Sequence, residues 1–327
     1  MPDTVAVTFN VRDRERAVVA DALKGLATPV FVTDLGDAER QAALSGAKAI
    51  LARNTNQELR DGEPALLASA KLVQFMTAGI DFVKFERFPD SVPIASNGGA
   101  YAGPMAEHAL TMVLAGAKRL IIEHQALVRG EFNQFTRNRV LAGGTCGIIG
   151  FGGIGEACAR LFRALDMRIF AINRRGASDE PTDWIGTMEQ IDTLLAASDV
   201  IIVATPLTPA TQGFIGAGEL GKMKPTATLV NLARGEVIQE APLYAHLTAH
   251  PGFTACIDAW WVEPVRHGAF RMDHPFMSLP NVIGSPHNSA SVPGMTEAAI
   301  RRAIVNIRRA LIGETPRYLL GKHERMG

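Results

Sequence analysis

A glycine-rich turn constrains the fold of this chain more than any other feature of its sequence. The segment GIIGFGGIGEACARLFRAL, residues 147–165, places glycines between an apolar run and a segment of helical period. In such a turn the first glycine permits a sharp bend, the second lets backbone N–H groups approach a pyrophosphate, and the third allows close packing of helix on strand. The pattern predicts a dinucleotide site at a helix N-terminus, with a ligand-free turn as the alternative. Its residues are Gly150, Gly152, Gly153, Ile154 and Gly155.

The next apolar run ends in INRRG, where a dinucleotide site often carries an acidic residue. That acid accepts hydrogen bonds from the ribose hydroxyls of NAD. Here Asn173 occupies its place, and Arg174 and Arg175 follow. Asparagine does not repel a phosphate, and guanidinium groups suit phosphate oxygens. The sequence therefore predicts a preference for NADPH, with NADH as the other usable cofactor and two solvated turn arginines as the alternative interpretation.

Short apolar runs alternate with segments of helical period along the whole chain. This alternation predicts an α/β protein with two doubly wound parallel-sheet domains, a Rossmann nucleotide-binding domain and a flavodoxin-like substrate domain. We expect residues 1–98 plus 289–327 to form the substrate-binding domain and residues 99–288 the dinucleotide-binding domain. We also expect one long helix over 102–128, and an amphipathic segment near 292–313 that packs back on the first domain.

Composition narrows the class of partner. The chain has 327 residues, 47% of them hydrophobic, which is enough for two cores. Its 33 basic and 33 acidic residues cancel, so nothing indicates a nucleic acid or an anionic membrane surface. The three cysteines show no disulfide or metal-ligand spacing, and no leader or spanning segment is evident, so we expect a cytoplasmic protein without a metal that binds a small molecule.

Three polar residues stand just after predicted strands of the second domain. Arg234 follows ATLVNLA, Glu263 follows FTACIDAW, and His287 follows NVIGSP. The carboxyl ends of parallel strands face the ligand crevice, so we expect these side chains to meet there. Together they offer a cation for a carboxylate, a histidine for a proton, and a carboxylate to orient that histidine. Taken singly, each has a structural explanation: a helix-capping cation, a turn residue and a strand-end histidine.

Several motifs in a fixed order carry a resemblance to a known family. AEHAL, GIIGFGGIG, ATPLTPATQGFI, LVNLARGEVI, IDAWWVEP and SPHNSA resemble the matching blocks of the D-isomer-specific 2-hydroxyacid dehydrogenases. The resemblance implies that Arg234 holds the substrate carboxylate, His287 is the acid/base and Glu263 is its partner. It also implies cofactor contacts for Thr205, Pro206, Leu232, Ala233 and Asp258, and substrate contacts for the loop Thr77, Ala78 and Gly79.

The resemblance implies an NADPH-preferring reductase of small 2-oxo acids such as glyoxylate or hydroxypyruvate. The hydride would come from nicotinamide C4 and the proton from His287, giving a D-2-hydroxy acid. A dehydrogenase of another anion, such as phosphite or a bulkier 2-oxo acid, and a corepressor-like nucleotide sensor are the alternatives. The family also implies a homodimer built around residues 102–128.

Two departures from the family pattern lie near Glu263. Trp260 and Trp261 replace smaller residues, and they either narrow the substrate pocket or belong to the core or a subunit contact. The loop between Glu263 and His287 contains His267 and His274, which we expect in a surface turn.

Overall fold

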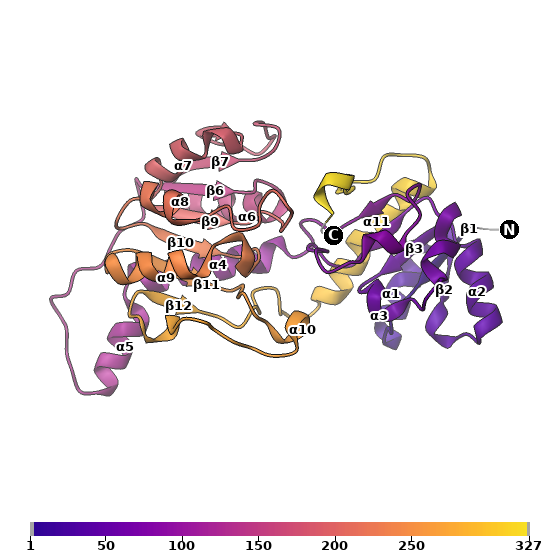
Figure 1. Cartoon of the computed structure of the whole chain (residues 1–327), viewed down its shortest axis with the longest axis horizontal. Helices are drawn as coiled ribbons and strands as arrows, with labels where there is room; N and C mark the ends of the chain where they lie inside the picture. The colour runs from indigo at the N-terminus through magenta and orange to yellow at the C-terminus, as the bar shows by residue number, and fades with distance from the viewer. Residues whose placement is uncertain (1–2, 326–327) are drawn as a thin grey trace. The chain divides into compact units, whose positions relative to one another are not determined.

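The computed structural model describes residues 3–325 and divides the chain into two compact units. Unit 1 comprises Met1–Tyr101 and Val292–Gly327, and unit 2 comprises Ala102–Ser291 (Figure 1). The boundaries expected from the sequence lie a few residues from these. This division does not identify the ligand of either unit, so the substrate-binding and dinucleotide-binding roles stay predictions.

Unit 1 contains a five-stranded parallel sheet of order β2-β1-β3-β4-β5, the flavodoxin-like arrangement. Its strands are β1 Asp3–Val7, β2 Ala27–Phe31, β3 Ala49–Ala52, β4 Val73–Phe75 and β5 Ile94–Ala95. Its α-helices are α1 Asp13–Leu23, α2 Asp37–Gly46, α3 Thr55–Glu58 and α11 Met295–Leu311.

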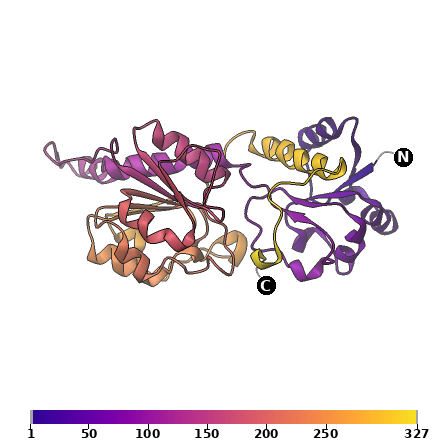
Figure 2. The same ribbon diagram turned by 90° about the horizontal axis from the view of Figure 1, so that it is seen from above.

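Both faces of this sheet are covered, as its continuous apolar strands require. Val5 and Val7 of β1 point to one face, where they join the apolar residues of α1 and α11. Ala6 points to the other face, into a cluster with Leu44 of α2. Figure 2 shows α11 beside the N-terminal part of the chain, although it is nearly 300 residues away in sequence. The apolar face of α11 thus packs on unit 1, as expected.

Unit 2 contains a seven-stranded parallel sheet of order β12-β11-β10-β9-β6-β7-β8. Numbered within the unit, six of these strands follow the 3-2-1-4-5-6 order of the Rossmann fold, with β12 added at the edge. The two sheets confirm the predicted fold class. The strands are β6 Thr145–Ile149, β7 Arg168–Ile172, β8 Trp184–Gly186, β9 Val200–Val203, β10 Thr228–Asn231, β11 Thr254–Ile257 and β12 Val282–Gly284.

Helices cover both faces of the second sheet, α4 and α6 on one and α7, α8 and α9 on the other (Figure 2). No helix within residues 3–325 combines the length and apolar character needed to cross a membrane. The α-helices are α4 Ala102–Ala117, α5 Leu120–Val128, α6 Gly153–Arg163, α7 Ile191–Ala197, α8 Ala217–Lys222, α9 Glu240–Ala249 and α10 Pro264–His267. The short 3-10 helices of both units are Val32–Asp34, Glu63–Ser69, Phe85–Arg87, Met188–Gln190, Gly235–Val237, Phe276–Ser278 and Lys322–Glu324.

The expectation of one long helix over 102–128 was wrong. The chain forms α4 and α5, separated where Arg119 adopts a left-handed backbone with φ 52°. The C-terminal end of α4 is held by a distant segment, since the backbone N–H of Arg139 donates to the carbonyl of Ala117 over 2.9 Å. Lys118 and Arg119, the two residues between the helices, are neither glycine nor proline, and the break is revealed by this contact and the conformation of Arg119.

Candidate active site

The glycine turn joins β6 to α6 at the point where the strand order reverses. Gly150 has φ 97°, and a Cβ there would lie 2.5 Å from the backbone nitrogen of Thr205. A Cβ on Gly155 would lie 2.4 Å from the carbonyl oxygen of Gly150. These two glycines are therefore required by the protein's own packing, one for the approach to the loop after β9 and one for seating α6 on the turn.

Gly152 differs from Gly150 and Gly155 because no contact with the described residues requires it to be glycine. It is exposed, its φ is −109°, and a Cβ there would meet no atom of residues 3–325 within 4 Å. The space that a side chain would fill lies at the N-terminus of α6, where backbone N–H groups favour an anion. The local structure therefore fits a phosphate group that approaches the backbone closely.

The INRRG segment forms a tight turn after β7. The side chain of Asn173 donates from Nδ2 to the carbonyl of Ala177 over 2.9 Å and accepts the backbone N–H of Arg175 over 2.9 Å. Asn173 thus holds the shape of the turn, and the side chains of Arg174 and Arg175 are exposed on it.

His287 and Glu263 form the ion pair expected from the sequence. Nδ1 of His287 lies 2.8 Å from both Oε1 and Oε2 of Glu263, which is 7% exposed. Oε1 also accepts the backbone N–H of Trp260 over 2.7 Å. Because Nδ1 is engaged, Nε2 is the nitrogen of the 34% exposed imidazole that can exchange a proton with a ligand.

The charge of Glu263 is compensated by its surroundings. Burial, the largest single influence, acts to raise the pKa of this carboxyl group. The hydrogen bond and charge of His287, the N–H of Trp260 and the charge of Arg234 together outweigh it, so the pKa is lowered. Glu263 is therefore ionised at neutral pH, and Arg234 lies close enough for its charge to act on it. The structure brings the three predicted residues of unit 2 together.

The backbone around Arg234 is held by a residue that the sequence analysis missed. Asn231, buried at the end of β10, accepts the N–H of Ala233 over 3.0 Å and donates to the carbonyl of Arg234 over 2.9 Å. A Cβ on Gly235 would lie 2.3 Å from the carbonyl carbon of Trp260, so the two loops touch backbone to backbone. A lone amide residue closing the apolar run TLVN was the only sequence signal for Asn231.

Asp258 lies fully buried at the end of β11. Its Oδ1 accepts the hydroxyl of Ser285 over 2.6 Å and the backbone N–H of Asn288 over 3.2 Å. Its Oδ2 is buried without a hydrogen-bond partner among residues 3–325. An orphaned carboxylate oxygen requires a donor, and a carboxamide NH₂ of a bound cofactor would supply one.

The two tryptophans make packing contacts within unit 2. The Trp260 indole donates to the carbonyl of Ser285 over 2.8 Å and meets Phe276 edge-on, with ring centroids 6.4 Å apart. Trp261 stacks on Phe276, with centroids 5.3 Å apart. These contacts support the packing interpretation of both residues. The expected surface turn contains α10, and there Nδ1 of His267 accepts the backbone N–H of Glu263 over 2.9 Å.

The remaining predicted residues fall into two groups. Thr205 and Pro206 follow β9, and Leu232 and Ala233 are buried after β10, at the carboxyl edge of the sheet in unit 2. The loop Thr77, Ala78 and Gly79 follows β4 in unit 1, where the hydroxyl oxygen of Thr77 is buried with no partner among the described residues. Within 3–325, no three His, Cys, Asp or Glu side chains are grouped as metal ligands.

Comparison with known proteins identifies the family. Residues 110–289 match the family described as "D-isomer specific 2-hydroxyacid dehydrogenase, NAD binding domain". The chain belongs to this family. It is therefore an NAD(P)-dependent oxidoreductase, and the residues that match the NAD-binding domain of the family lie in unit 2.

Individual relatives agree with this assignment. A glyoxylate reductase of Thermococcus gammatolerans is 30% identical over 283 residues, which are 84% of this chain and 81% of the relative. A D-3-phosphoglycerate dehydrogenase of Archaeoglobus fulgidus is 36% identical over 188 residues, 57% of this chain, but the match spans only 34% of that longer protein. A Xanthobacter autotrophicus family member, solved with NADPH and MES, shares the fold with TM-score 0.78 at 23% identity, covering 98% of each chain.

Replacing Gly152 tests the cofactor site directly. The variant Gly152→Val should fold normally, because its side chain enters open space, and should weaken binding of a nicotinamide dinucleotide by about tenfold or more, because that space is needed by the phosphates. Binding is measured by titrating the purified protein with NADPH or NADH and following tryptophan fluorescence, and folding by thermal unfolding.

The matched control is Gly218→Val in α8, where a Cβ also meets no atom of the described residues within 4 Å. It should leave cofactor affinity unchanged. Wild-type affinity in Gly152→Val would show that the dinucleotide does not approach this turn.

Proposed function

We propose that the protein reduces small 2-oxo acids to D-2-hydroxy acids, with NADPH as its preferred cofactor. The observation that carries the proposal is the contact between the imidazole of His287 and the buried carboxylate of Glu263, with the positive charge of Arg234 close to it. The similarity to a glyoxylate reductase favours a substrate of two or three carbons, such as glyoxylate or hydroxypyruvate.

Each side chain has a chemical task in this reaction. A bound nicotinamide would supply hydride to the C2 carbonyl carbon of the substrate. Protonated His287 donates from Nε2 to the carbonyl oxygen as negative charge grows there, while ionised Glu263 stabilises the imidazolium and keeps Nδ1 engaged. The guanidinium of Arg234 binds the substrate carboxylate and orients the reacting carbon.

The preference for NADPH rests on the turn after β7. Asn173 keeps its own side chain within the turn and presents two exposed arginines where an acidic residue would repel a 2′-phosphate. Guanidinium groups at this position favour the additional phosphate.

The proposal is tested by the rates of NADPH and NADH oxidation with glyoxylate, hydroxypyruvate, pyruvate and phenylpyruvate. We expect the fastest turnover with glyoxylate and hydroxypyruvate, and a higher kcat/KM for NADPH. In Arg175→Gln the preference for NADPH should fall by about tenfold, since a charge-assisted bond to phosphate contributes about 1.5–3 kcal/mol. Lys222→Gln, an exposed cation on α8, is the control.

Two results would contradict this proposal. Cofactor binding without turnover of any 2-oxo acid would exclude the reductase activity, and equal use of the two cofactors by the wild type would exclude the role of the arginines.

The Glu263→Gln variant tests the contact between Glu263 and His287 through kcat. The lowered pKa of Glu263 means that its charge is present at neutral pH, and an amide removes that charge while keeping an acceptor for Trp260. Without that charge, Nδ1 of His287 loses its charged partner, so kcat for 2-oxo acid reduction at neutral pH should fall by about tenfold or more.

Asp273→Asn, in the same loop but exposed on the surface, should leave kcat unchanged. An unchanged kcat in Glu263→Gln would show that Glu263 does not support the proton donor.

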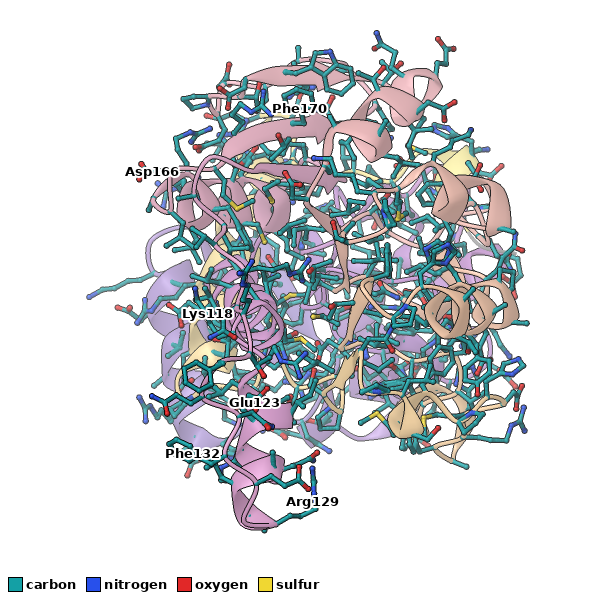
Figure 3. All side chains as sticks on the ribbon, turned by 90° about the vertical axis from the view of Figure 1, so that its left-hand side faces the viewer. Lys118, Glu123, Arg129, Phe132, Asp166 and Phe170 are labelled. Atoms are coloured by element: carbon teal, nitrogen blue, oxygen red, sulfur yellow. The ribbon has the colours of Figure 1, made fainter. Side chains whose placement is uncertain are left out.

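We further propose that the protein is a homodimer. Helix α5 and the loop 129–142, here called the arm, extend from the body of unit 2 (Figures 1 and 3). Its large apolar side chains are exposed, with Phe135 at 92%. A concentration of such side chains marks a protein interface. They are Leu120, Ile121, Leu127, Val128, Phe132, Phe135 and Val140.

Sedimentation equilibrium should give twice the 35.1 kDa chain mass. The double variant Phe132→Glu/Phe135→Glu should shift the protein to monomer, because two charges would be buried in the interface. Ile312→Glu, at an exposed apolar residue of unit 1, is the control. A monomeric wild type would contradict the proposal.

A further inference from the structure

The turn that carries His287 has a strained backbone and needs support from outside itself. His287 has φ 51°, in the left-handed region that non-glycine residues rarely adopt. Such a conformation persists only where the surroundings enforce it. The ion pair with Glu263 fixes the imidazole, but it does not by itself fix the backbone on either side.

One buried carboxylate contacts both sides of this turn. Oδ1 of Asp258 accepts the hydroxyl of Ser285, two residues before His287, and the backbone N–H of Asn288, directly after it. Ser285 is also tied by its backbone, since its N–H donates to the carbonyl of Ile257 over 2.9 Å and its carbonyl accepts the indole of Trp260. Asp258 thus bridges the two sides of the turn that holds the histidine.

The orientation of that carboxylate depends on a residue from a distant helix. Nε2 of His108, in α4, lies 2.9 Å from the hydroxyl oxygen of Ser285 and 3.7 Å from Oδ1 of Asp258. Because the Ser285 proton is directed to Asp258, its oxygen accepts from an Nε2–H of His108. The donors run in one direction, from His108 through Ser285 to Asp258.

This direction leaves the two carboxylate oxygens with different tasks. Oδ1 receives the hydroxyl and the N–H that hold the His287 turn, and Oδ2 is left buried without a partner among the described residues. A carboxylate without the Ser285 hydroxyl could turn about its Cβ–Cγ bond and move Oδ1 away from the backbone N–H of Asn288, which would release the turn.

We propose that His108 and Ser285 are positioning residues that fix the Asp258 carboxylate, and through it the backbone of His287. Oδ1 is thereby committed to the histidine turn and Oδ2 to the amide of the cofactor. The inference rests on the proposed function for the role of His287 as proton donor.

The test compares variants that remove or keep the donor. Ser285→Ala and His108→Leu should each lower kcat for 2-oxo acid reduction by about tenfold, with a smaller change in KM, because the proton donor is misplaced while the carboxylate-binding Arg234 is not. His108→Gln restores an N–H donor and should recover most of the loss. Thr111→Ala, an exposed residue on the same helix, controls for changes in α4.

A second measurement needs no turnover. In the cofactor-free wild type, the imidazole N–H that His287 shares with Glu263 should give a low-field proton NMR signal, assigned by its absence in His287→Asn. The signal should shift or broaden in Ser285→Ala and His108→Leu and return in His108→Gln. The dissociation constant for NADPH should rise in the same two variants.

The outcomes separate this inference from the proposed function. A wild type that reduces no 2-oxo acid refutes the proposed reductase activity. The NMR signal then still tests whether His108 and Ser285 position His287. Lower thermal stability of His108→Leu with an unchanged signal and unchanged kcat would overturn the inference, because His108 would then be a structural residue only.

Discussion

The charge of Glu263 is the constraint on which the site depends. A carboxylate that is 7% exposed is costly to bury unless charges and donors compensate it. Here the imidazole of His287, the backbone N–H of Trp260 and the charge of Arg234 do so, and each comes from a different loop after a strand. Meeting this one electrostatic requirement therefore brings the proposed proton donor and the proposed substrate cation together.

Close approach of backbones makes that meeting sterically feasible. Gly150 lets the turn between β6 and α6 contact the loop after β9, and Gly155 lets α6 pack against that turn. Gly235 lets the Arg234 loop lie directly against the backbone of Trp260. Gly152 is different because the protein leaves its surroundings open. Open space in front of a glycine fits a ligand here because it lies at the N-terminus of α6, where backbone N–H groups favour an anion.

The sequence predicted most of the fold because the relevant signals are local. Apolar runs of strand length, helical periods and the glycine turn each lie within one short stretch, and parallel strands bring the residues after their carboxyl ends to a common edge. Arg234, Glu263 and His287 could be found for that reason. The prediction of one long helix over 102–128 was wrong because the apolar pattern of the sequence continues across the break at Arg119. The contact at the end of α4 comes from Arg139, which is distant in sequence.

By itself, the sequence determined the two parallel-sheet units, the turn for a dinucleotide and the chemical types at the strand ends. Only the tertiary structure decided which other residues hold these units, this turn and these strand-end side chains in place. His108 and Ser285 are separated by 177 residues, and Asn231 donates to backbone carbonyls of two loops, at Arg234 and Ala259. Such contacts depend on which helix packs against the end of which strand. Neither the periodicity nor the spacing of residues along the chain predicts that packing.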